Sequence, residues 1–168
     1  MKNIAFVLLS LVLLGACSSG DQTKTFKLEN IEFVYSGPIF EGSNSAQYIA
    51  KIDLKEILGA DYEEGMEIDE AALKKAFVEI VKPEGCTDIS SFVMSLASDN
   101  PDLAMQELAV LNPIKSYGGK IKLKPSPTAD ATDYFAEKSV YVIVDASFLK
   151  DVDADVLVKG TFEFELKY

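Results

Sequence analysis

The chain has 168 residues, of which 48% are hydrophobic and 26% are charged, a balance typical of one soluble globular domain. Its basic residues are all Lys, and 16 of them face 27 Asp and Glu, which gives a formal net charge of −11. Such a chain repels phosphate backbones, so we expect no nucleic-acid partner. The absence of His removes the commonest general base and metal ligand. We therefore expect a protein that is not an enzyme, with no metal site and no cofactor.

The first 16 residues have the layout of a signal peptide. Lys2 gives a positively charged start, and an apolar run follows over residues 4–14, interrupted by Ser10. A membrane-spanning helix needs about 20 apolar residues, so this shorter run fits the core of a signal peptide. The alternatives are an ordinary leader cut near Ala16 and a buried helix of a cytosolic protein.

The end of the leader is Leu14-Gly15-Ala16-Cys17, which resembles the lipobox of bacterial lipoproteins. The resemblance covers only residues 1–17. It implies that the chain is cut before Cys17, that the Cys17 sulfur receives diacylglycerol, and that the new amino group is acylated. Two or three acyl chains hold a protein firmly on a membrane. Cys17 is thus the predicted lipidation site, and the membrane is the predicted partner through its lipid.

The polar residues after Cys17 predict a flexible tether over 17–25, followed by one domain over 26–168. By the same resemblance, Ser18 rather than Asp directly after the Cys favours transfer to the outer membrane of a Gram-negative bacterium. Whether the protein lies on the periplasmic side or on the cell surface is left undecided, because Asp21 alone is a poor surface-export signal. Cys86 has no intramolecular partner once Cys17 is acylated, and we interpret it as a structural or incidental thiol, with a reactive thiol as the alternative.

The domain begins with a strand over 26–35 whose apolar residues change parity near Asn30, which predicts a β-bulge. A second strand is expected over 46–54. The segment 55–75 reads as an acidic loop, in which Asp69 is expected to cap a short helix over 71–73. The acids between Asp61 and Glu70 include Glu63 and Glu64, and they are candidates for the carboxylate pair of a hydrolase. A solvated acidic face is the simpler interpretation.

Four further strands are expected over 77–81, 92–96, 106–111 and 121–123, with a helical turn within 130–138. One of them presents three positive side chains on one face, from Lys120, Lys122 and Lys124. This stripe suits an anion or lipid head groups. The preferred interpretation is an edge strand on which Lys discourages aggregation.

The clearest element is a final hairpin over 140–148 and 156–168, in which alternate residues are apolar. Its connection contains Asp151, Asp153 and Asp155, spaced like the start of a calcium loop. The loop then lacks the required Gly and Glu, because Val156 and Phe162 stand in their places. A solvated turn is the preferred interpretation. Five aromatics suit either the core or a glycan or lipid site: Tyr35, Phe40, Tyr48, Tyr134 and Tyr141.

About eight short strands separated by turns predict an all-β fold, a two-sheet antiparallel β-sandwich of immunoglobulin-like or jelly-roll-like type. A β-barrel is the alternative. The leading functional hypothesis is a cell-envelope lipoprotein whose non-catalytic domain binds or scaffolds an unknown envelope protein or glycan. The rival hypotheses are a carrier or sensor for an apolar ligand inside a β-barrel, and a carboxylate-based hydrolase.

Overall fold

The computed structural model describes residues 22–82, 88–117 and 119–168. Within them the chain forms eight strands, one short α-helix and two 3-10 turns. The elements are β1 (Thr23–Tyr35), β2 (Gly42–Lys51), α1 (Leu54–Leu58), η1 (Gly59–Asp61), β3 (Glu70–Lys82), β4 (Ile89–Ala97), β5 (Gln106–Leu111), β6 (Ile121–Pro125), η2 (Thr132–Ala136), β7 (Ser139–Phe148) and β8 (Val156–Lys167). The all-β prediction is confirmed, and β1 already begins inside the stretch 17–25 that the sequence suggested as a tether.

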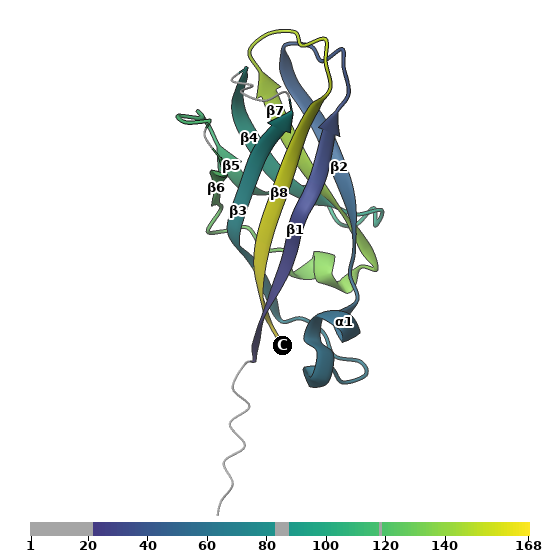
Figure 1. Ribbon diagram of the computed structural model, residues 1–168. Coiled ribbons are helices and arrows are strands. Elements are labelled where there is room, and N and C mark those ends of the chain that lie inside the picture. The colour runs from purple at the N-terminus through teal and green to yellow at the C-terminus, as the bar shows by residue number, and fades with distance from the viewer. Residues whose placement is uncertain (1–21, 83–87, 118) are drawn as a thin grey trace, which may run out of the picture.

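All eight strands belong to one antiparallel sheet with the order β1-β8-β3-β6-β5-β4-β7-β2. The sheet curls until its two edge strands, β1 and β2, lie next to each other (Figure 1). No ladder of hydrogen bonds joins them. The link between the two halves is also thin, since β5 and β6 share only two paired positions. The fold is therefore a nearly closed barrel, and the barrel alternative describes it better than two separate sheets.

The bulge predicted near Asn30 is present in β1. Leu28 pairs with Phe162 and Ile31 with Gly160, so β1 carries one extra residue at this point. Asn30 itself has a φ of 56°, in the left-handed region that Asn tolerates better than most residues. Because of the extra residue, the apolar side chains before and after the bulge point to the same side of the sheet. This explains why they change from even to odd positions in the sequence.

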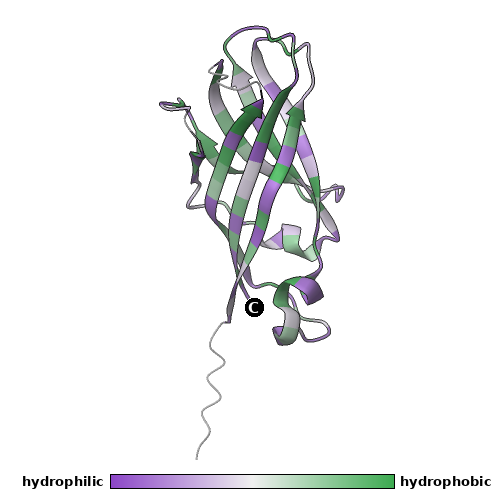
Figure 2. Ribbon diagram, viewed as in Figure 1, coloured by the Kyte–Doolittle hydropathy of each residue, from purple (hydrophilic) through white to green (hydrophobic). Residues whose placement is uncertain are grey.

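Strands β7 and β8 show the predicted alternation, because every second residue in each is buried. Figure 2 shows hydrophobic and hydrophilic residues alternating along the last part of β8. The predicted hairpin between them is wrong, however. β7 pairs with β2 and β4, whereas β8 pairs with β1 and β3. The two strands face each other across the core, and residues 149–155 cross from one wall to the other. Alternation fixes which face a strand buries but says nothing about its neighbour.

The helix predicted after Asp69 is also wrong. Residues 71–73 lie in β3, and the Asp69 amide donates to the Lys167 carbonyl at 2.8 Å as the β3–β8 ladder begins. The helix of this region lies earlier in the chain, over Leu54–Leu58. Asp53 caps it, since its Oδ1 accepts from the amides of Lys55 at 3.0 Å and Glu56 at 3.2 Å.

The core fills the space between the two walls with large side chains. Phe33 and Phe162 meet edge to face with ring centroids 6.2 Å apart, and both are fully buried. Phe164 and Phe135 meet in the same way at 5.5 Å, which joins β8 to η2. Other fully buried residues are Phe92, Met94, Leu96, Leu108, Leu123 and Tyr134. The interior is thus occupied by side chains from both walls.

Candidate functional site

The two ends of the barrel differ in character. One end, here called the α1 end, comprises residues 22–24, 54–69 and Tyr168. The other, here called the tip, comprises the loops 36–41 and 149–155. The first described residues lie at the α1 end, because Gln22 and Tyr168 exchange backbone hydrogen bonds of 3.2 and 3.1 Å. Lys24 binds the Leu58 carbonyl at 3.2 Å and the Asp61 carboxylate at 3.1 Å. The chain therefore enters the domain beside α1 (Figure 1).

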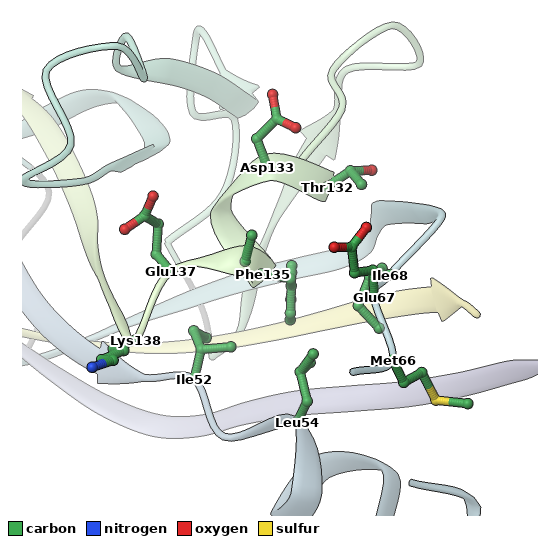
Figure 3. Close-up of a pocket in the computed structure, with 11 residues that line it drawn as sticks. Ile52, Leu54, Met66, Glu67, Ile68, Thr132, Asp133, Phe135, Glu137 and Lys138 are labelled. Carbon is green, nitrogen blue, oxygen red and sulfur yellow. The ribbon is translucent and has the colours of Figure 1, made fainter. Parts of the chain in front are cut away.

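A cleft of about 400 Å³ lies beside the α1 end, between the chain that leads into α1 and η2 (Figure 3). Its apolar lining is Ile52, Leu54, Met66, Ile68 and Phe135. Its polar lining includes Glu67, Asp133, Glu137 and Lys138. In Figure 3 the carboxylates of Asp133 and Glu137 point away from the apolar side chains. The cleft thus has an apolar floor and a mainly acidic rim.

A second cleft, of about 430 Å³, opens where the edge strands β1 and β2 separate near α1. Phe26 and Leu28 line it from β1, Tyr48 from β2, and Ile57 from α1. Phe26 is held from behind, since its ring meets Phe135 edge to face at 5.6 Å. The cleft is a consequence of the unclosed sheet, and it gives the α1 end a second apolar recess.

The tip is built from two loops that brace each other. Ile39 and Val152 exchange backbone hydrogen bonds of 2.8 and 2.9 Å. The Asp151 carboxylate accepts from the Glu41 amide at 2.8 Å, and the Asp155 carboxylate accepts from the Gly37 amide at 2.9 Å. The loops are also tightly packed, because a Cβ on Gly37 would lie 2.7 Å from the Asp153 carbonyl oxygen. These contacts fix the shape of the tip.

Two large apolar side chains project from this braced frame. Phe40 is 66% exposed and Leu149 is 57% exposed, while their neighbours Ile39 and Phe148 are buried. Both backbones are fixed, since the Phe40 carbonyl accepts from Asn44 Nδ2 at 2.8 Å and the Leu149 amide donates to the Asp88 carbonyl at 2.7 Å. Gly42 pairs with Phe148, so Phe40 and Leu149 lie just beyond the same pair of residues. The tip therefore displays two exposed apolar groups on adjacent loops.

The three acids suggested by calcium-loop spacing lie at the tip. Asp151 and Asp155 bind backbone amides of the facing loop, as described, and Asp153 packs its backbone against Gly37. Across the described residues, no group of three or more acidic or cysteine side chains is arranged to hold a metal ion. Asp151 and Asp155 instead connect the two loops of the tip through these hydrogen bonds.

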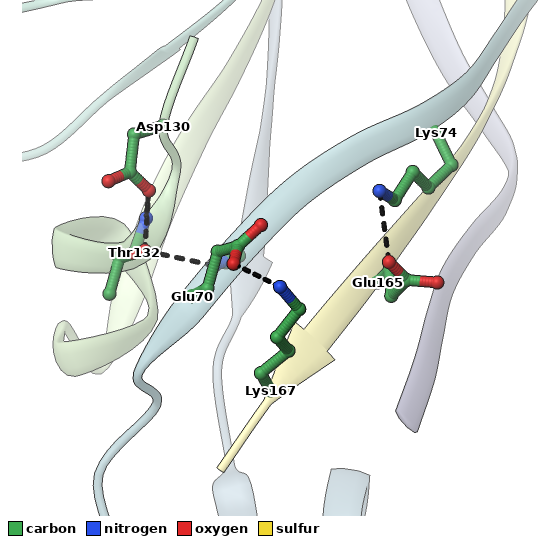
Figure 4. Close-up of polar contacts among 7 residues, drawn as sticks. Glu70, Lys74, Asp130, Thr132, Glu165 and Lys167 are labelled. Carbon is green, nitrogen blue, oxygen red and sulfur yellow. Dashed lines mark hydrogen bonds and ion pairs between the residues drawn. The ribbon is translucent and has the colours of Figure 1, made fainter. Parts of the chain in front are cut away.

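The acids between Asp61 and Glu70 are not brought together as one cluster. Asp61 pairs with Lys24, and Glu70 pairs with Lys167 across the β3–β8 ladder (Figure 4). Glu67 lines the first cleft, whereas Glu63 and Glu64 are exposed in the loop. Two of these carboxylates are therefore paired with Lys side chains of β1 and β8.

Ion pairs with Lys recur along this wall. Glu165 pairs with Lys74 at 2.9 Å (Figure 4), and Glu163 pairs with both Lys75 at 2.8 Å and Lys27 at 3.4 Å. The hydrogen bond from Lys75 is the main reason why the pKa of the Glu163 carboxyl lies below its usual value. The outer face of β8 is thus covered by paired charges.

The positive stripe on β6 is confirmed as an exposed face, since Lys120, Lys122 and Lys124 alternate with buried Ile121 and Leu123. The preferred interpretation, protection of a sheet edge, is wrong. β6 lies between β3 and β5 in the strand order, and the edges are β1 and β2. Its ladders are short, with three paired positions toward β3 and two toward β5.

The five aromatics divide between the core and the surface. Tyr35 is buried and its hydroxyl donates to the Val144 carbonyl at 2.8 Å. Burial, with a smaller contribution from Asp145, raises the pKa of that hydroxyl far above its usual value. Tyr134 is buried as well, and its hydroxyl donates to the Ala104 carbonyl. Tyr141 binds Asp99 at 2.9 Å, whereas Phe40 and Tyr48 are exposed.

Sequence reasoning named Phe40 among the aromatics but missed Leu149. The available signal was position. Leu149 directly follows the buried Phe148, so an apolar residue stands where the alternation of β7 predicts an outward-facing side chain. An apolar residue that falls out of register at the end of a strand points away from the core. The same rule applies to Phe40, which follows the buried Ile39.

Both cysteines, Cys17 and Cys86, lie outside the described residues, so the predicted lipidation site is not part of the described structure. Among the residues described, no helix is long and apolar enough to cross a membrane. No protein family matches the chain, and no curated protein is detectably similar to it in sequence. The lipobox-like sequence of residues 14–17 and the geometry of the domain are the features that bear on function.

Proposed function

We propose that the protein is a lipid-anchored lipoprotein of a Gram-negative cell envelope, on the outer membrane, whose domain binds a partner without catalysing a reaction. The anchor rests on the lipobox-like sequence that ends at Cys17. The observation that carries the binding role is the opposition of the two ends: the chain enters at the α1 end, and the braced apolar tip lies at the far end.

The dimensions support this arrangement. Five peptide steps separate Cys17 from Gln22, and they reach at most about 18 Å. The 13 residues of β1 lead from the α1 end to the tip, a rise of about 40 Å. An anchor at Cys17 therefore keeps the α1 end close to the membrane, while the tip extends away from it toward a partner.

Several contacts favour binding over hydrolysis. Within the acidic segment, Asp61 and Glu70 are engaged by Lys side chains. At the tip, Asp151 and Asp155 accept from backbone amides. Carboxylates used in this way hold the fold and are not placed on either side of a substrate bond, as a glycosidase requires.

The carrier hypothesis needs an internal space for an apolar ligand. The rings of Phe33, Phe92 and Phe162 fill the region between the walls and are fully buried. Open clefts lie instead at the surface: Phe26 and Leu54 line two of them beside the α1 end, and Leu111 lines a third near β6. For this reason we propose a binding surface rather than an enclosed ligand site.

The anchor is tested by Cys17→Ser, with Cys86→Ser as the matched control. We expect Cys17→Ser to abolish labelling by a fatty-acid analogue and to release the protein from the membrane fraction. Cys86→Ser should remain labelled and membrane-bound. If Cys17→Ser still labels and still sediments with membranes, the proposed lipoprotein is wrong.

A further inference from the structure

We propose that the tip docks onto a protein partner that offers an apolar socket bordered by Lys or Arg side chains. Phe40 and Leu149 are the groups that enter the socket. This inference rests on the proposed function and deepens it by assigning the contact surface and the chemistry of the partner.

The tip meets the first requirement of a docking surface, which is an apolar group held ready for contact. The Phe40 carbonyl is bound by Asn44, and the Leu149 amide is bound to the Asp88 carbonyl. The bridge between Ile39 and Val152 holds the two loops together. Because the backbone is already fixed, binding loses little conformational entropy, and the exposed ring can contribute most of its burial free energy.

Solitary exposed apolar residues are common on protein surfaces, so exposure alone carries little weight. Here two of them extend from adjacent loops at one end of the barrel, and their immediate neighbours Ile39 and Phe148 are buried. Interfaces commonly obtain most of their affinity from a few such anchors, with aromatic residues prominent among them. Phe40 has the properties of an anchor of this kind.

The charges around the anchors select the partner. Exposed acids surround them on both loops, namely Glu41, Asp151, Asp153 and Asp155. The one Lys within these two loops, Lys150, is paired with Asp88 at 3.3 Å. A second copy of the tip would bring acid against acid, and an anionic lipid surface would be repelled in the same way. A partner with basic residues around an apolar socket is complementary in both respects.

Photo-crosslinking in intact cells tests this proposal. A photoreactive amino acid replaces Phe40, Leu149 or, as the control, Met105. Met105 is 63% exposed but lies beside Gln47 and Ile143 on the outer face of the barrel. We expect positions 40 and 149 to crosslink to the same protein, at residues of an apolar site bordered by Lys or Arg. Crosslinking no stronger than at position 105, or only to a second copy or to lipid, would overturn the proposal.

The crosslinked protein is then purified and titrated with the full processed chain. Phe40→Ser should weaken binding at least about tenfold, while Met105→Ser leaves the Kd unchanged. Glu41 and Asp153 have exposed side chains without a hydrogen bond or ion pair within the described residues. Glu41→Gln combined with Asp153→Asn should weaken binding about threefold or more at low salt and have little effect at high salt. Unchanged affinity of Phe40→Ser would contradict the proposal.

Fractionation of the same cells separates the two levels of the proposal. Protein that is absent from the membrane fraction means that the anchored role is wrong. Protein that is present there but lacks tip-specific crosslinks means that only the docking surface is wrong.

Discussion

The tip and the α1 end are built from the same sheet, yet they treat apolar residues in opposite ways. Beside the α1 end, Leu54 and Phe26 line open clefts and lie against the core. At the tip, Phe40 and Leu149 project outward from loops that are fixed by backbone hydrogen bonds. A rigid apolar projection suits contact with another molecule. In the proposed arrangement the α1 end is therefore the attachment end and the tip is the contact end.

The largest effect is expected for Phe162→Ala, which tests whether the tip and the α1 end share one core and unfold together. Phe162 is fully buried and packs edge to face on Phe33, so its loss should cost about 3–5 kcal/mol of the free energy of unfolding. Urea unfolding followed by tyrosine fluorescence and by circular dichroism should give one coincident, shifted transition. Two separate transitions would mean that the two ends are independently stable, which would contradict a shared core.

A change at Gly37 should damage the tip alone. In Gly37→Ala the new methyl carbon would lie 2.7 Å from the Asp153 carbonyl oxygen, so the two loops must move apart. We expect a loss of about 1–3 kcal/mol, with faster amide exchange in the tip and unchanged exchange in α1. Ser36→Ala, an exposed neighbouring position, is the control. Exchange that rises equally at both ends would contradict a locally braced tip.

A change at Asp53 should act at the other end. Asp53 accepts hydrogen bonds from two amides in the first turn of α1, so Asp53→Ala should cost about 1 kcal/mol. Asp53→Asn keeps a side-chain acceptor and should restore most of the loss. Amide exchange at Lys55 and Glu56 measures the effect directly. Equal exchange in Asp53→Ala and the unchanged protein would show that the cap is unimportant.

The smallest effect on stability is expected at Phe40. Its side chain is largely exposed, so Phe40→Ala should change the free energy of unfolding by no more than about 0.5 kcal/mol. The same substitution at Phe162 is expected to have a many-fold larger effect. Thermal unfolding of the two variants side by side makes the comparison. A large loss at Phe40 would mean that the ring stabilises the tip and is not reserved for contact.

The strands could be predicted because each of them has one apolar face, which gives an alternating sequence pattern. Alternation in β7 and β8 predicted the buried residues, and the change of parity at Asn30 predicted the bulge. Strand pairing could not be predicted in this way. A buried face on each of β7 and β8 fits a hairpin and two opposite walls equally well, and only the rest of the sheet decides between them.

The candidate site was harder to predict than the fold. Asp69 has the chemistry of a helix cap, but its amide is used by the β3–β8 ladder, and Asp53 performs that role instead. The regular spacing of Asp151 and Asp155 is explained by amides on a loop more than 100 residues away in sequence. The loops that carry Phe40 and Leu149 are brought side by side by the β2–β7 register and the Ile39–Val152 bridge, which a single sequence does not specify.

The central claim, that the α1 end lies at the membrane and the tip lies away from it, can be measured directly. Lipidated protein carrying Cys86→Ser is labelled with a fluorophore through Glu63→Cys at the α1 end or Glu41→Cys at the tip, and is reconstituted into phosphatidylcholine vesicles that contain a quencher-labelled lipid. The account predicts strong quenching at position 63 and little at position 41. Equal quenching at the two positions, or stronger quenching at position 41, would contradict it.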